Sequence, residues 1–114
     1  MTLKDDTPRI LDALRQVEGI TVTTAWPKEE PTRPVVLLTL AGDSPADHRD
    51  DREYLTELEY YVRVFAAKAA DMRRICAAVH DAMEALGYRR TFRWEEPGED
   101  GGWRQTALRY NTYL

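Results

Sequence analysis

The chain has 114 residues, of which 43% are hydrophobic and 32% charged, with a net charge of -4 and a pI near 5.2. This length fits one domain, 1–114, with one core. The acidic balance argues against a protein that wraps nucleic acid, which needs clustered Lys and Arg. A single cysteine, Cys76, excludes an internal disulfide framework and suits a reducing cytoplasm. Neither a signal-peptide core nor an apolar run of about 20 residues is found, so we expect a cytosolic protein unless an assembly carries it elsewhere.

The first predicted element is an amphipathic helix. Thr7 before Pro8 is typical of an N-cap with a first-turn proline, and Gly19 is expected to end the helix. An earlier start, with Thr2 as the cap, would leave Pro8 inside the helix at the cost of a hydrogen bond. The apolar stripe of this helix consists of Ile10, Leu11, Leu14 and Val17.

Two strands and a long loop follow. Residues 20–26 are rich in β-branched side chains and predict a short strand, after which three prolines interrupt regular structure. Residues 35–40 predict a strand that is buried on both faces and is closed by Gly42. Residues 42–53 form the most polar segment and predict a long loop of the functional or disordered kind.

The second half predicts a strand, a helix and a hairpin. Residues 55–66 alternate between apolar and polar side chains, as expected of a half-exposed strand. An alanine-rich helix follows and stops at Gly87. Residues 88–95 and 103–114 predict a hairpin around a turn at 97–102. The helix has one continuous apolar seam: Met72, Ile75, Cys76, Val79, Met83 and Leu86.

The predicted order is therefore α-β-β-β-α-β-β. It indicates an α+β fold, with a mostly antiparallel sheet of four to five strands and two helices on one face. The other face would be half polar and in need of protection or a partner. Five aromatic side chains are either ordinary core or rim residues or positions that a neighbouring subunit covers: Tyr61, Phe65, Trp94, Trp103 and Tyr113.

Candidate metal and catalytic groups are weak in this sequence. Cys76, His80 and Glu84 share a helical face, but a structural zinc site needs four ligands and no second cysteine exists. The acidic residues near His48 lack the spacing of a calcium loop, so a hydrated charged loop is favoured. Glu57 and Glu59 predict a wet strand face rather than an acid–base pair. We expect no enzyme activity, no cofactor and no metal.

Basic and aromatic residues alternate near the start of the predicted hairpin. Such a pattern can bind single-stranded nucleic acid by stacking. In an acidic chain, a cationic edge that meets an acidic partner surface is favoured instead. The residues concerned are Arg89, Arg90, Phe92, Arg93 and Trp94.

Several segments together resemble the small tail-completion, or tail-terminator, proteins of long-tailed bacteriophages, which act in head-tail joining. The resemblance covers nearly the whole chain, except for 43–53 and 97–102. It is carried by Leu3-Lys-Asp-Asp, Pro34-Val-Val-Leu-Leu-Thr-Leu-Ala-Gly, Tyr61-Val-Arg-Val-Phe-Ala-Ala-Lys before the alanine-rich helix, Ala85-Leu-Gly-Tyr-Arg-Arg-Thr-Phe and Ala107-Leu-Arg-Tyr-Asn-Thr.

The resemblance implies a virion protein of the tail-neck region that assembles in the host cytoplasm as a ring, usually six-fold. Such a ring caps the tail tube, ends its polymerisation and joins it to the head. The implied partners are further copies of the chain, the major tail-tube protein and a head-side neck protein. DNA would pass through the ring without specific binding, and no membrane is involved. A head-side adaptor or stopper protein, or a small dimeric ligand-binding or regulatory module, is the alternative.

Loops and edge strands supply contacts of the kind that such a ring needs. We therefore expect 43–53 and 97–102 to touch neighbouring subunits or line the lumen. Shortening either segment should block tail joining while the isolated subunit still folds. The candidate contact residues are Asp43, Asp47, Asp50, Asp51, Arg90, Arg93, Trp94, Glu99, Asp100 and Trp103.

Overall fold

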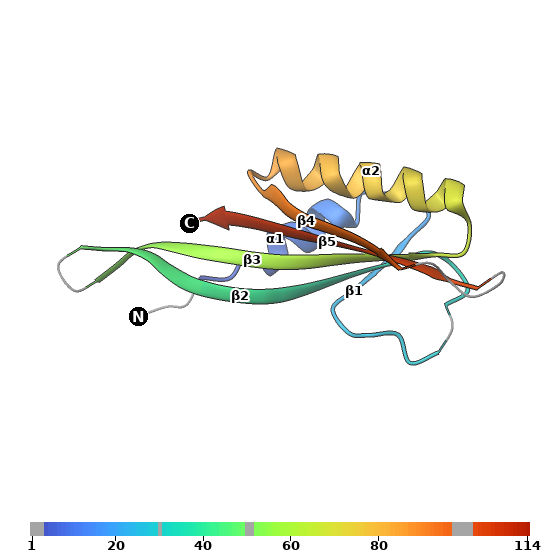
Figure 1. Cartoon of the computed structure of the whole chain (residues 1–114), viewed down its shortest axis with the longest axis horizontal. Coiled ribbons are helices and arrows are strands. Elements are labelled where there is room, and N and C mark those ends of the chain that lie inside the picture. Colours follow the sequence, from blue (N-terminus) through green and yellow to red (C-terminus); the bar gives the residue numbers. More distant parts are fainter. Residues whose placement is uncertain (1–3, 30, 50–51, 97–101) are drawn as a thin grey trace.

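The computed structural model describes residues 4–29, 31–49, 52–96 and 102–114. Two helices and five strands follow one another in the predicted order (Figure 1). The elements are α1 (Thr7–Leu14), β1 (Thr21–Thr23), β2 (Val35–Arg49), β3 (Arg52–Ala66), α2 (Ala69–Ala85), β4 (Arg89–Glu96) and β5 (Arg104–Tyr113).

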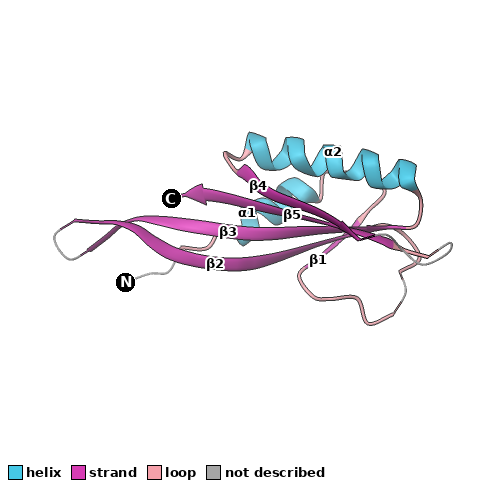
Figure 2. Cartoon of the chain, viewed as in Figure 1, coloured by secondary structure: helices cyan, strands magenta, loops and turns pink. Residues whose placement is uncertain are grey.

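The five strands form one sheet in the order β1-β2-β3-β5-β4 (Figure 2). β1 pairs with β2 in parallel, and the other three pairings are antiparallel. Both helices pack on the same face of this sheet, because their buried residues join one cluster with alternate residues of β2, β3 and β5. The predicted α+β fold is therefore confirmed.

The core lies between the helices and the sheet. Strand residues two apart point to the same face, so the even-numbered positions of β3 enter the core together. Leu58, Tyr60, Val62 and Val64 are all 0% exposed. The predicted seam of α2 faces them, with Ile75, Val79 and Met83 also fully buried and Cys76 packed at the margin. Gly87 ends α2 with a φ of 93°, a conformation that glycine adopts without steric cost.

The predicted loop at 42–53 is wrong, because β2 and β3 continue through it as a β-hairpin. Gly42 does not close β2; the register shifts between Leu40 and Gly42 and the pairing then runs on to Arg49 opposite Arg52. Backbone hydrogen bonds of a ladder do not require apolar side chains, so a polar segment can remain in strand. We call 43–49 of β2 and 52–56 of β3 the arm, which projects from one end of the sheet in Figure 1.

Two further elements are shorter than predicted. α1 ends at Leu14 rather than at Gly19, because the backbone N–H groups of Gln16 and Val17 bond to carbonyls three residues back, which tightens the chain into turns. β1 covers only Thr21–Thr23, the stretch that pairs with β2. The remaining boundaries lie within a few residues of those predicted.

A buried hydrogen-bond network fixes α1 to the sheet. Asp6 is the N-cap residue, one position before the predicted Thr7, and its carboxylate does not cap the helix. Instead it accepts hydrogen bonds from Arg9 at 2.8 Å and from the Tyr88 hydroxyl at 2.7 Å. The backbone N–H of Asp6 donates to the Tyr60 hydroxyl at 3.0 Å. The Arg9 guanidinium and, to a smaller extent, the Tyr88 hydroxyl hold the pKa of Asp6 below its usual value against the opposing effect of burial.

We expect Asp6→Asn to lower the free energy of unfolding by about 1–3 kcal/mol at pH 7, because Arg9 and Tyr88 lose a charged acceptor. A depressed pKa stabilises the fold above the unfolded-state pKa of about 3.9, and this contribution disappears as pH falls through the lower folded-state value. Urea unfolding at pH 7 and at about pH 2.5 should therefore show a difference from wild type that shrinks in acid. Asp12→Asn, at a side chain that is 81% exposed, is the control. It should leave the free energy of unfolding unchanged at both pH values.

Candidate subunit interface

One face of the sheet carries no helix among the described residues. We call it the open face; it is formed by the odd-numbered residues of β3 from Glu57 onward, of β5 and of β2 up to Thr39, together with the β4 residues that pair with them. Charged groups on it include Arg63 and Arg109, and Glu57 accepts a hydrogen bond from the side chain of the buried Asn111 at 2.9 Å. Leu37 and Ala107 are buried in its centre. The predicted half-polar second face is thus present.

Large aromatic side chains are exposed on and beside the open face. Trp26 is 54%, Phe92 48%, Trp94 49% and Tyr113 53% exposed. Isolated exposed hydrophobic residues are common, but several aromatics on one face are typical of a surface that a partner covers. The sequence identified Trp94 and Tyr113 as candidate covered positions and placed Phe92 in the pattern of basic and aromatic residues, but it missed Trp26, which ends the predicted strand 20–26.

Arg63 organises the aromatic side chains at one end of this face. Its guanidinium lies over the rings of Trp26 and Tyr61, at 5.0 Å and 4.6 Å from their centroids, and donates to the Thr39 hydroxyl at 3.1 Å. Cation–π contacts of this type are favourable and hold both rings in place. Trp26 also meets Phe65 edge to face, with the ring centroids 5.8 Å apart. This end of the open face is therefore preorganised.

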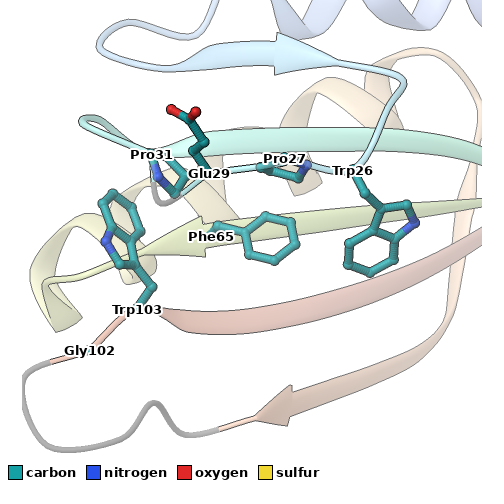
Figure 3. Close-up of a pocket in the computed structure, with 7 residues that line it drawn as sticks. All are labelled: Trp26, Pro27, Glu29, Pro31, Phe65, Gly102 and Trp103. Atoms are coloured by element: carbon teal, nitrogen blue, oxygen red, sulfur yellow. The ribbon is translucent and has the colours of Figure 1, made fainter.

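An aromatic groove of about 400 Å³ adjoins this cluster (Figure 3). The rings of Trp26, Phe65 and Trp103 follow one another along it, so three segments far apart in the sequence supply its walls. Pro27, Pro31, Gly102 and the exposed Glu29 complete the lining. Trp103 is a predicted contact residue, and the structure places it here with Phe65.

β4 divides its basic and aromatic residues between the two faces of the sheet. The register shifts between Arg90, opposite Tyr110, and Phe92, opposite Arg109. This bulge puts Arg90 and Arg93 on the helix side, whereas Phe92 and Trp94 lie on the open face. The Arg109 guanidinium lies 5.7 Å from the Phe92 ring centroid and donates to Thr91 at 3.0 Å. The predicted single patch of alternating arginines and aromatics is therefore two separate surfaces.

Two of the predicted contact residues, Asp43 and Asp47, lie away from the open-face aromatics. Asp43 is exposed at the base of the arm, and Asp47 belongs to the arm. The structure thus separates these carboxylates from Trp94 and Trp103. The remaining predicted contacts fall outside the described residues: Asp50, Asp51, Glu99 and Asp100.

The helix side of β4 forms a second candidate surface. Arg90 and Arg93 line a depression between β4 and α2, beside the half-buried Cys76 and His80. Burial raises the pKa of the Cys76 thiol, and it raises the pKa of Tyr110 to about 12. The Tyr110 hydroxyl lies 3.0 Å from His80 Nδ1, and His80 Nε2 lies 3.4 Å from a Glu84 carboxylate oxygen. Cys76, His80 and Tyr110 therefore pack at the edge of the core.

The described ranges hold neither a metal cluster nor a membrane-spanning helix. No group of three or more His, Cys, Asp or Glu side chains there is placed to hold a metal ion. Neither α1 nor α2 has the length and apolar character that crossing a membrane requires.

We expect the double substitution Phe92→Ser and Trp94→Ser to weaken self-association by about tenfold while leaving the melting temperature within about 2 °C of wild type. Both side chains are half exposed, so their loss removes a contact surface and little core packing. Sedimentation velocity over a concentration series measures the association. A matched pair of changes on the outer surface of α2, Asp81→Ser with Ala85→Ser, should leave it unchanged.

Comparison with known proteins shows a likeness in fold. No protein-family model matches the sequence, and no curated protein matches it. The fold is similar to that of a chain in a solved structure described as "Virion of native gene transfer agent (GTA) particle", with a TM-score of 0.65. The two chains are 21% identical, and the match covers 90% of this chain and 88% of that one. At this identity the comparison establishes a shared fold.

Proposed function

We propose that this chain is a structural virion protein that caps the end of a phage tail tube as a ring, ending tube polymerisation and joining tail to head. The observation that carries the proposal is the likeness in fold to a chain of a gene transfer agent virion, which covers 90% of this chain and 88% of that one. The resemblance of the sequence to tail terminators supports the finer role.

Two physical features suit a subunit of such an assembly. The open face exposes aromatic side chains that a neighbour could desolvate. The arm extends the molecule to 56 Å along its longest axis, against 25 Å and 23 Å along the others. Contacts between an arm and a different surface of the next copy are heterologous, and they close into a ring when the rotation between subunits allows it.

In this role the chain is not an enzyme and needs no cofactor. Its partners would be further copies of itself in a ring of about six, the major tail-tube protein and a head-side neck protein. The net charge of -4 would let DNA pass through the ring, since like charges oppose adhesion to phosphate. Its place would be the tail-neck region of the virion, after assembly in the host cytoplasm. An adaptor or stopper role in the same neck is the nearest alternative.

A ligand-binding module is the second candidate, favoured by the aromatic groove beside Trp26 and Trp103, whose size suits a small molecule. Translating the reading frames that flank the gene separates the two. We expect a tail-tube gene beside it, with portal and capsid genes near by. Metabolic or regulatory neighbours, with no virion genes, would contradict the virion role and favour the ligand-binding one.

A further inference from the structure

A groove runs between α2 and β4 on the side of the molecule away from the open face. We call it the α2–β4 groove; two adjoining depressions of about 280 Å³ and 520 Å³ form it and share Met72, Arg73, Arg93 and Glu95. Its floor is apolar, from Met72, Leu108 and the thiol of Cys76. Four arginines and two glutamates line it, so the groove is net basic in an acidic chain.

Most of the arginines of this groove form no ion pair with the described residues of their own subunit. Arg93 pairs with Glu95 at 2.8 Å, and both side chains are more than half exposed. Arg73, Arg90 and Arg104 form no ion pair with any carboxylate in the part of the chain that the structure describes. Arginines that line a depression with an apolar floor favour an acidic occupant, because its charge complements theirs.

The arm is a segment of the same chain with complementary charge. The sequence of residues 43–56, which comprises the arm and residues 50 and 51 between its strands, contains five carboxylates and two arginines. The aromatic groove is a poorer match for such a segment, because its charged lining residue is Glu29. Charge complementarity therefore favours the α2–β4 groove over the aromatic groove as the surface that meets the arm.

Among the described residues, most of the arm pairs with no third strand of its own subunit. Pairing of β3 with β5 begins at Glu57 opposite Tyr113, and Thr56 exchanges backbone hydrogen bonds with Leu114. Beyond that point the ladder holds β2 and β3 alone. A two-stranded hairpin is marginally stable in water, and docking on a neighbour would supply the missing contacts.

We propose that the α2–β4 groove receives the acidic arm of a second copy of this chain. The contact joins two different surfaces, so it repeats head to tail around a ring rather than pairing two subunits symmetrically. The inference rests on the proposed ring function and assigns the interface that would close it. It gives Arg73, Arg90, Arg93 and Arg104 the role of clamping the arm of the neighbour.

Mixed crosslinking tests this contact without changing any charge. Cys76→Ala removes the native thiol, and Ala46→Cys or Ala77→Cys then places a single thiol on the arm or on the exposed rim of the groove. A bismaleimide is added to each protein alone and to their mixture, with the tail-tube protein present. We expect a covalent dimer from the mixture at a yield at least about fivefold above that of either variant alone.

Crosslinks at other positions, or rings without the mixed product, would contradict the proposed contact between the arm and the α2–β4 groove. A dimer from Ala46→Cys alone would indicate arm-to-arm pairing about a two-fold axis. Crosslinking of the arm to Ala25→Cys, an exposed site beside Trp26, would place it at the aromatic groove instead. Rings by mass photometry without the mixed product would overturn the inference and leave the proposed function standing, whereas neither rings nor product would contradict both.

Charge reversal supplies a second, independent test. Arg73→Glu with Arg93→Glu should weaken ring formation by about tenfold, and adding Asp43→Arg with Asp47→Arg should restore most of it. Arg15→Glu with Arg33→Glu, at exposed positions away from the groove, should have no such effect. If the substitutions in the arm do not restore ring formation to the groove variant, the arm and the groove are not in direct contact.

Discussion

Removing the arm should abolish assembly and leave the subunit folded. The cleanest change replaces residues 46–55 with Asn-Gly, a two-residue turn that joins Pro45 to Thr56, which already face each other in the ladder. Every residue of the described core is retained. We expect self-association to weaken at least about 100-fold, or about 2.7 kcal/mol, because four carboxylates and the ribbon that presents them are lost.

Folding of the truncated chain is the internal control. Its melting temperature should stay within about 3 °C of wild type, since the arm contributes no residue to the core cluster. Sedimentation velocity for association and circular dichroism for folding are measured on the same sample. Normal ring formation by the shortened chain would contradict a role for the arm, and a collapse of the fold would show that the arm is structural.

The second large effect concerns where the core ends along β2. Leu38 is 1% exposed, whereas Leu40, two residues later on the same face, is 47% exposed. We expect Leu38→Ala to lower the free energy of unfolding by about 3 kcal/mol, through lost transfer energy and the cavity left behind. Leu40→Ala should cost less than about 1 kcal/mol, because its side chain is already half hydrated.

Urea unfolding of both variants and wild type measures this difference directly. The midpoint should move for Leu38→Ala with little change in slope, since the surface exposed on unfolding stays nearly the same. Equal losses for the two variants would mean that the core continues toward the arm in solution. Such a result would place the arm against the body of its own subunit rather than free for a partner.

Sequence periodicity predicted the core well where one face of an element is buried. The alternation from Leu58 to Val64 and the seam from Met72 to Met83 were both identified, and the structure buries the predicted faces. Buried positions require apolar side chains, so the spacing of apolar residues in the sequence reveals the buried face. The stop at Gly87 was equally clear, because its positive φ is costly for other residues.

The arm was not predictable by the same reasoning. Polar composition and Pro45 favour a loop, yet the ladder continues because its hydrogen bonds join backbone groups, whatever the side chains. With no core behind it, a two-stranded ribbon carries no apolar alternation that would reveal it. The end of α1 at Leu14 was missed for a related reason: Val17 continues the apolar stripe, but the local turn ends the helix.

The candidate interface was only partly predictable. Trp94 and Tyr113 were placed on an exposed face, as the alternation of their strands implies. The separation of Arg93 from Trp94 would follow from simple alternation, but the shared face of Arg90 and Arg93 depends on the bulge in β4. A bulge is set by pairing with β5, which a single strand sequence does not disclose. The convergence of Trp26, Phe65 and Trp103 likewise comes from tertiary packing.

The proposed capping role is tested most directly at the end of a tail tube. The tail-tube protein encoded beside this gene is polymerised with and without the purified chain, and the products are imaged by negative-stain electron microscopy. We expect one ring at one end of each tube, and a mean tube length that falls as the molar ratio of this chain rises. Tubes of unchanged length with bare ends, at concentrations where the chain is folded, would contradict the proposed function.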